Sequence, residues 1–212
     1  MEKPTKIFSE QEQTNHTAND ILKDLKQGND RFVNNKPLER NIDALKADAR
    51  SGQHPKAIIL SCVDSRVPVE TIFDQSIGDI FVARVAGNIE SNDVLGSIEY
   101  ATKVAGCKLV FVLGHESCGA VSAACDKVRM GNISGLVRKI EPAMEASANI
   151  GEPHDSSNKE FVDKVIDTNV RLTCDRIYKN SDIIKELADT NNVQIAGGVY
   201  SLQSGKVHFF DD

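Results

Sequence analysis

The sequence predicts one α/β domain, residues 1–212, with a central, mostly parallel β-sheet flanked by helices. Short runs of β-branched and other apolar residues alternate with segments of helical periodicity, which is typical of a sheet covered by helices. The chain is long enough for one domain to bury a substantial core without disulfides or structural metals. Residues 193–210 contain two strand-like runs separated by Ser204 and Gly205, which predict a C-terminal β-hairpin.

The amino-terminal part predicts a helical arm before the first strand. Residues 1–16 are polar, and we expect them to form a disordered or extended arm. Thr17 and Asp20 then form a capping arrangement that opens a helix over residues 17–35. A short helix follows around residues 42–49 and ends near Gly52.

The remaining elements alternate along the chain. Pro68 suits the first turn of a helix that runs through Phe73, and Gly106 closes a helix that begins at Ser91. Apolar runs predict buried strands at 56–61, 80–85 and 108–114, and helices are expected from about residue 118 and over 133–148, 159–178 and 181–190.

Composition excludes several classes of function. The formal net charge is −6 and no basic block stands against it, so neither a nucleic acid nor an anionic membrane is an expected partner. No apolar run approaches the length that spans a bilayer. The first residues lack an apolar signal core, so we expect a cytoplasmic protein, although a cleaved periplasmic precursor would look the same.

The cysteines do not form a disulfide framework, because their number is five and their spacing is irregular. In a reducing compartment, thiols serve as metal ligands, nucleophiles or small core residues. Cys107, Cys125 and Cys174 stand among apolar neighbours, and we expect each to be buried in the core.

Chemistry-bearing residues follow two of the predicted strands. The stretch "LSCVDSRVP" places Cys62, Asp64 and Arg66 after one strand, and "HESCG" places His115 and Cys118 after another. Sites in open α/β sheets form outside the carboxyl ends of the strands, so these side chains are expected to meet. Two thiols, an imidazole and a carboxylate fit zinc. Either motif alone has an alternative that involves no metal: H-x-x-C is only a weak signal of a metal site, and D-S-R is usually a surface turn.

The motifs "CVDSR", "GDIFVARVAGN" and "GHESCGAV" together resemble those of the β-class carbonic anhydrases. The similarity runs from Gly28 to the final hairpin and covers most of the chain. The resemblance implies a zinc ion held by Cys62, His115 and Cys118, and reversible hydration of carbon dioxide to bicarbonate and a proton. It also implies that Arg66 holds Asp64 away from zinc in the open state, whereas Asp64 is the fourth ligand only in a closed state.

The physical chemistry agrees with these implied roles. Zinc lowers the pKa of a bound water and supplies hydroxide near neutral pH. Two thiolates donate more charge to the ion than neutral imidazoles do, so the water should be less acidic and a nearby proton acceptor useful. Asp64 is the expected acceptor.

The family's substrate pocket matches further positions. Gln53 stands where plant-type, open-site members carry a glutamine, and Phe81 and Tyr100 match apolar residues that come from the neighbouring subunit of a homodimer. Without the resemblance, Phe81 and Tyr100 would be ordinary core residues. The N–H of Gly119 could add an anion contact at a helix start. The resemblance thus implies a homodimer or a tetramer built from dimers.

Two positions depart from the pattern. Members regulated by bicarbonate carry a tryptophan where this chain has Ile59, and the chain has no tryptophan, so we favour the open site. Glu116 replaces a small hydroxyl residue; it either faces solvent or aids proton export. Three rival readings stay open: hydrolysis of carbon disulfide or carbonyl sulfide at the same zinc, a non-catalytic zinc or redox-sensing protein, and a dehydrogenase, which lacks its G-x-G-x-x-G motif here.

Overall fold

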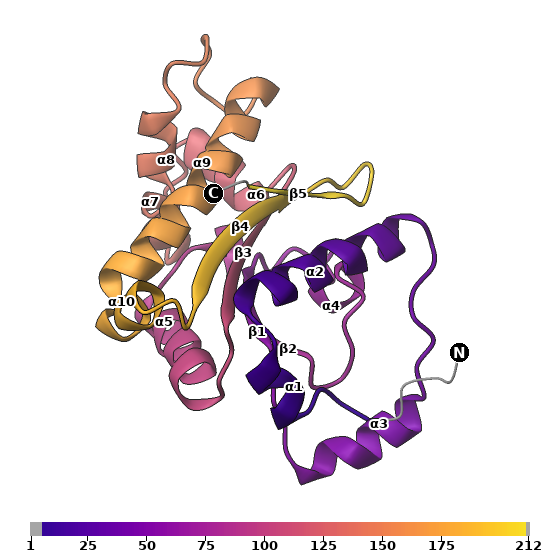
Figure 1. The fold of residues 1–212 in the computed structure, drawn as a ribbon. Coiled ribbons are helices and arrows are strands. Elements are labelled where there is room, and N and C mark those ends of the chain that lie inside the picture. The colour runs from indigo at the N-terminus through magenta and orange to yellow at the C-terminus, as the bar shows by residue number, and fades with distance from the viewer. Residues whose placement is uncertain (1–5, 211–212) are drawn as a thin grey trace.

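The computed structural model describes residues 6–210 and contains one five-stranded sheet at its centre (Figure 1). The strand order is β2-β1-β3-β4-β5, in which β4 and β5 are antiparallel and the other neighbours are parallel. The predicted fold class is confirmed. The strands are β1 (Ala57–Ser61), β2 (Ile80–Arg84), β3 (Leu109–His115), β4 (Gln194–Tyr200) and β5 (Val207–Phe209).

Helices cover both faces of the sheet, which explains why β1 and β3 are apolar and buried at nearly every position. Alternate side chains of a strand point to opposite faces. Ile59 and Phe111 therefore pack with Phe73 below one face, whereas Ile58 and Val112 pack on the other.

The two layers of helices are visible on either side of the sheet (Figure 1). One layer holds α2 (Ala18–Val33) and α4 (Val69–Ile72), and the other holds α5 (Asn92–Glu99), α9 (Lys159–Asn180) and α10 (Asp182–Asp189). A third apolar cluster lies beyond the carboxyl ends of the strands and includes Cys62 and Cys118. Its helices are α6 (Gly119–Cys125), α7 (Ile133–Arg138) and α8 (Glu141–Ala146), together with the start of α9.

The expectation of a disordered or extended arm is wrong for residues 10–15, which form α1 (Glu10–Asn15). Ser9 and Glu12 close a capping box at its start, and the Gln13 amide donates to the carbonyls of Pro55 and Ala105, each at 2.8 Å. These bonds tie the arm to the body of the chain. Residues 1–5 lie outside the described residues. The predicted short helix is confirmed as α3 (Ile42–Asp48), which continues into η1 (Ala49–Ser51).

Two predicted helices are interrupted. The helix expected over 91–106 ends as α5 at Glu99, and residues 100–104 form a wider π-type turn, η3 (Tyr100–Val104). The helix expected over 133–148 divides into α7 and α8, because Pro142 has no N–H to donate and stands in the first turn of α8. Among residues 6–210, no helix is both long enough and apolar enough to cross a bilayer.

Candidate metal centre

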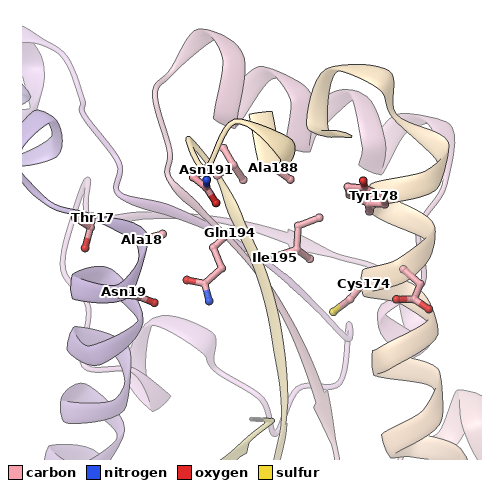
Figure 2. A pocket seen from close by; sticks show the side chains of 11 residues that line it. Thr17, Ala18, Asn19, Cys174, Tyr178, Ala188, Asn191, Gln194 and Ile195 are labelled. Carbon is pink, nitrogen blue, oxygen red and sulfur yellow. The ribbon is translucent and has the colours of Figure 1, made fainter. Parts of the chain in front are cut away.

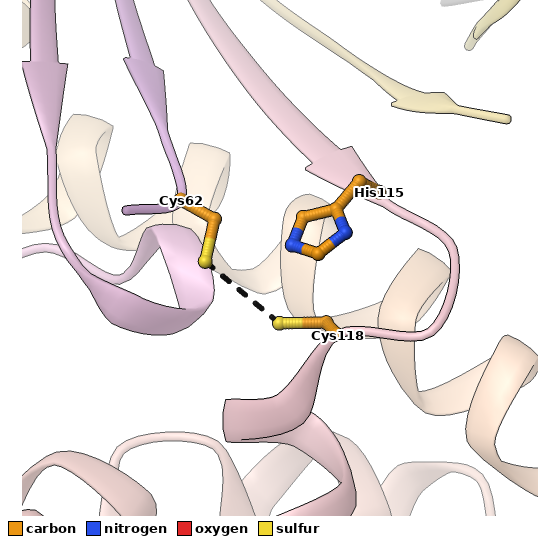
Figure 3. Close-up of side chains that lie close together, drawn as sticks. All are labelled: Cys62, His115 and Cys118. Carbon is orange, nitrogen blue, oxygen red and sulfur yellow. Dashed lines mark hydrogen bonds between the residues drawn. The ribbon is translucent and has the colours of Figure 1, made fainter. Parts of the chain in front are cut away.

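Three potential metal ligands meet beyond the carboxyl ends of two neighbouring strands (Figure 3). Cys62 follows β1, His115 ends β3, and β1 and β3 pair side by side in parallel. Ser117 then adopts the left-handed φ of +53°, and Cys118 is the residue that immediately precedes α6. Their ligand atoms all lie within 4.8 Å of one another.

The spacing of these atoms suits a tetrahedral zinc ion. The two Sγ atoms are 4.0 Å apart. Two thiolates bound to zinc at about 2.3 Å in tetrahedral geometry would stand about 3.8 Å apart, so little movement would be required. All three side chains are at least 96% buried, which favours a permanent ion over a surface contact.

His115 presents a single nitrogen to this cluster. Its Nδ1 lies 2.8 Å from the carbonyl oxygen of Glu116, which can only accept, so Nδ1 carries the proton. The Nε2 atom is buried and has no hydrogen-bond partner among residues 6–210. A histidine fixed in this way is oriented as a metal ligand. This orphaned nitrogen and the two sulfur atoms fit zinc.

The two thiols share a proton in the metal-free protein. A hydrogen bond from the Cys118 side chain lowers the pKa of Cys62 to about 4. The hydrogen bond with Cys62 raises the pKa of Cys118 well above its usual range, and burial and repulsion between two thiolates raise it further. One negative charge is therefore already present, and a cation would release the second proton.

Asp64 and Arg66 form a two-pronged ion pair at the edge of the cluster. Arg66 Nε donates to Asp64 Oδ1 at 2.9 Å, and Arg66 Nη2 donates to Oδ2 at 2.7 Å. The hydrogen bond from Arg66 is the main reason that the pKa of Asp64 lies well below its usual range. Asp64 Oδ2 is still 3.9 Å from His115 Nε2, so the carboxylate stands within reach of an ion. The side chains expected from the two motifs are thus brought together.

Sequence reasoning missed the groups that hold the backbone of residues 62–64 in place. Arg84, at the end of β2, donates from Nε to the Cys62 carbonyl at 2.9 Å and from Nη2 to the Asp64 carbonyl at 2.5 Å. The N–H of Gly87 points at Cys62 Sγ, with a nitrogen–sulfur distance of 3.4 Å. Both residues belong to the motif "GDIFVARVAGN", but their contacts run through backbone atoms that no residue pattern reveals.

An open pocket of about 620 Å³ lies away from the three ligands (Figure 2). Gln194 and Ile195, at the start of β4, line it together with α9 and the beginning of α2. In the parallel register, Gln194 pairs with Leu109 at the start of β3, whereas His115 pairs with Tyr200 at the other end. The pocket is therefore at the opposite end of the strands from the three ligands.

A family model described as carbonic anhydrase matches residues 57–207, which include all five residues of the cluster and the ion pair. The chain belongs to the carbonic anhydrase family. Carbonic anhydrase 2 of Mycobacterium tuberculosis is 39% identical over 187 residues, covering 87% of this chain and 88% of that protein. A carbonic anhydrase of Mycolicibacterium smegmatis is 39% identical over 188 residues, covering 87% and 89%.

Solved β-carbonic anhydrases share the fold. One from Sordaria macrospora, described as tetrameric, gives a TM-score of 0.70 at 24% identity, covering 79% of this chain and 86% of that one. One from Aspergillus fumigatus gives 0.71 at 22% identity, covering 90% and 88%. The shared fold and the sequence relatives together assign this chain to the β-class carbonic anhydrases.

The four residues that the sequence matches to a substrate pocket lie in three different places in the single chain. Phe81 and Tyr100 lie together, with ring centroids 6.3 Å apart, and line an open pocket on the face of the sheet that α5 covers. Gln53 is exposed between η1 and β1. Gly119 begins α6, and the space beside its Cα is open. The roles of these four residues stay predictions.

The predictions for the other cysteines and for Glu116 have different outcomes. Cys107 and Cys125 are buried as predicted, and Cys174 is partly buried. Glu116 does not simply face solvent: its carboxylate accepts from Ser201 Oγ at 3.0 Å and from the N–H of Leu202 at 2.9 Å. It thereby ties the end of β3 to the turn after β4.

Proposed function

We propose that this β-class carbonic anhydrase hydrates carbon dioxide reversibly with a zinc ion held by Cys62, His115 and Cys118. The observation that carries the proposal is the convergence of these buried ligands beside the Asp64–Arg66 pair. When bound, zinc lowers the pKa of water and provides a hydroxide nucleophile near neutral pH. A purely structural zinc site would need neither an adjacent ion pair nor an unused ligand position.

The ion pair gives Asp64 its role. A carboxylate beside a dication is strongly attracted to it, and Arg66 opposes that attraction with a planar fork that matches both carboxylate oxygens. Held there, Asp64 accepts a hydrogen bond from the water that attacks carbon dioxide and helps to remove its proton. The two hydrogen bonds between Asp64 and Arg66 support the open state in this proposal.

We also propose that the active unit is a homodimer or a tetramer of dimers. Phe81, on the edge strand β2, and Tyr100 line an open pocket whose lining includes none of the three ligands of their own chain. In a dimer joined at this edge, they would supply the apolar wall that an uncharged linear substrate requires. Gln53 and Gly119 would complete that pocket.

Zinc analysis of two matched cysteine variants tests the metal site. Cys118→Ser removes a proposed ligand, whereas Cys125→Ser changes a cysteine that is also buried, seven residues further along, but lies outside the cluster. We expect Cys118→Ser to lose most zinc and most stopped-flow carbon dioxide hydration, and Cys125→Ser to keep both if it folds. Full zinc occupancy in folded Cys118→Ser would contradict the ligand assignment.

A further inference from the structure

A backbone N–H contacts one of the proposed ligands. Gly87 donates to Cys62 Sγ at a nitrogen–sulfur distance of 3.4 Å, from the turn η2 (Ala86–Asn88) after β2. Glycine suits this position, because its φ is +74° and a Cβ would stand 2.8 Å from Ile140 Cδ1. A donor aimed at a thiolate stabilises the sulfur charge and fixes the direction of its lone pairs.

A buried side chain of α9 holds Gly87 from behind. Asn169 is 1% exposed, and its Nδ2 donates to the Gly87 carbonyl at 2.9 Å. The carbonyl that Asn169 binds and the N–H that binds Cys62 flank the same Cα, that of Gly87. Fixing the carbonyl therefore limits the backbone freedom of Gly87, including the direction of its N–H. Asn169 is not one of the three proposed ligands, and its hydrogen bond reaches the site through Gly87.

The same face of α9 holds the other end of this loop. Arg176, seven residues after Asn169, lies on the same side of the helix and pairs with buried Glu90 at 2.8 Å. Lys139 adds a bond to the Glu90 carbonyl at 2.8 Å. The loop from Gly87 to Glu90 is thus fastened to α9 at both ends, which makes the N–H···S contact a rigid one.

We propose that Asn169 is a positioning residue that holds the Gly87 N–H against the Cys62 thiolate and so sets the zinc affinity and the charge on the sulfur. The inference rests on the proposed zinc site. Nothing in the cysteine and histidine motifs marks Asn169, which lies more than fifty residues beyond Cys118. Its long-range contact with Gly87 brings it into the site.

Chelator competition and cobalt spectroscopy test this role. We expect Asn169→Leu, which has similar volume and no donor, to bind zinc about tenfold more weakly than the wild type. In the cobalt-substituted protein, the thiolate-to-cobalt charge-transfer band should move to longer wavelength, because the sulfur electrons lose a stabilising donor. Asn169→Ala removes the amide without adding an apolar branch and serves as the second variant if Asn169→Leu does not fold.

The control is Ile177→Val, which loosens packing on the same helix at a buried site away from Gly87. It should lower the melting temperature but leave zinc affinity and the cobalt band at wild-type values. If a folded Asn169 variant behaves like this control, Asn169 is only structural and the inference is wrong. If instead the wild type binds no zinc through Cys62, His115 and Cys118, the proposed function itself fails, and the two failures are distinguished.

Discussion

At the scale of single residues, Asp64 has two competing partners. Its Oδ2 is 2.7 Å from Arg66 Nη2 and 3.9 Å from His115 Nε2, so a small rotation separates pairing with Arg66 from binding an ion in the cluster. Arg66 is also held in place, because its Nη2 donates to the Ser117 carbonyl at 3.3 Å. The balance between these partners decides whether Asp64 acts as a proton acceptor or as a ligand.

We expect Arg66→Ala to retain zinc and to lose carbon dioxide hydration by about 100-fold or more, the scale of a lost proton acceptor. Without its restraint, Asp64 would turn toward the ion and occupy the position that water needs. Stopped-flow hydration assays and zinc analysis of the same preparation measure both properties.

Two further variants make this test specific. Arg66→Lys should recover little activity, because an ammonium group lacks the paired geometry of guanidinium. Asp64→Asn should also retain zinc while losing the proton acceptor. Near-normal turnover in Arg66→Ala would show that the pair is only structural, and loss of zinc would place Arg66 in the folding of the site.

The shared proton of Cys62 and Cys118 predicts that zinc affinity depends on pH. The pKa of Cys62 is lowered to about 4 and that of Cys118 is raised, so above pH 7 the metal-free protein holds one thiolate and one thiol. Zinc binding then displaces about one proton, and the affinity should rise about tenfold per pH unit. Chelator competition between about pH 7 and 9 measures this slope; a slope corresponding to two protons would show that both thiols are protonated without metal.

A residue of the site could be predicted from the sequence when its own side chain stands next to a strand end, and not when it acts through backbone atoms. Cys62, Asp64, Arg66, His115 and Cys118 were predicted because they act through their own side chains next to strand ends. Arg84, Gly87 and Asn169 act on backbone carbonyls or through a backbone N–H, and their partners are fixed only by the tertiary fold.

At the scale of elements, a buried carboxylate just after α4 fastens the last turn of α2 and the segment that follows it to the end of α4. Asp74 is 3% exposed and accepts from Arg31 Nε at 2.5 Å and Arg40 Nη1 at 2.6 Å, and its Oδ2 also accepts from the N–H of Leu38. Burial raises the pKa of Asp74, but the hydrogen bonds from Arg31 and Arg40 outweigh it and leave the pKa below its ordinary value. This network has no contact with the metal ligands and should act on stability alone.

We expect Asp74→Asn to lower the free energy of unfolding by about 3 kcal/mol, because it leaves two half-buried guanidinium groups without the buried anion that they share. Urea denaturation at fixed protein concentration measures the loss. Since the folded pKa is depressed, the difference from wild type should be complete above the ordinary value of 3.8 and shrink as the pH falls toward the folded value. The control Asp43→Asn removes an ion pair whose carboxylate is 92% exposed and should cost at most about 0.5 kcal/mol; equal losses in both variants would contradict the prediction.

Element boundaries were predictable where a local signal was used and wrong where one was overlooked. The capping box of Ser9 and Glu12 is present in the sequence as S-x-x-E, and it would have predicted α1. Pro142 likewise marked the start of α8. The π-type turn after Glu99 has no comparable capping or proline signal in the sequence.

At the scale of the whole molecule, the order of the strands explains both the site and the expected assembly. β1 and β3 are central neighbours, so the residues after them meet, whereas β2 is an edge strand that, among residues 6–210, pairs only with β1. The strand positions were predicted from apolar runs, but this order depends on long-range packing. Beside the edge, Tyr100 is 54% exposed and Val104 is 70% exposed, an apolar surface that a second copy would cover.

Gly96 allows this assembly to be tested without disturbing the fold. It lies on α5 in the open pocket lined by Phe81 and Tyr100, and a Cβ there would meet no atom within 4 Å. Arginine is a better helix former than glycine, so Gly96→Arg should fold at least as well as the wild type. The bulky cation would nevertheless block the approach of a partner at this surface. We therefore expect a variant that sediments as a monomer, keeps its zinc and loses most carbon dioxide hydration, because Phe81 and Tyr100 no longer reach the neighbouring site.

Gly135→Arg is the matched control for Gly96→Arg. Gly135 is also an exposed helical glycine with open space beside it, on α7, and its variant should remain oligomeric and active. A Gly96→Arg monomer with wild-type turnover would show that each chain carries a complete pocket of its own.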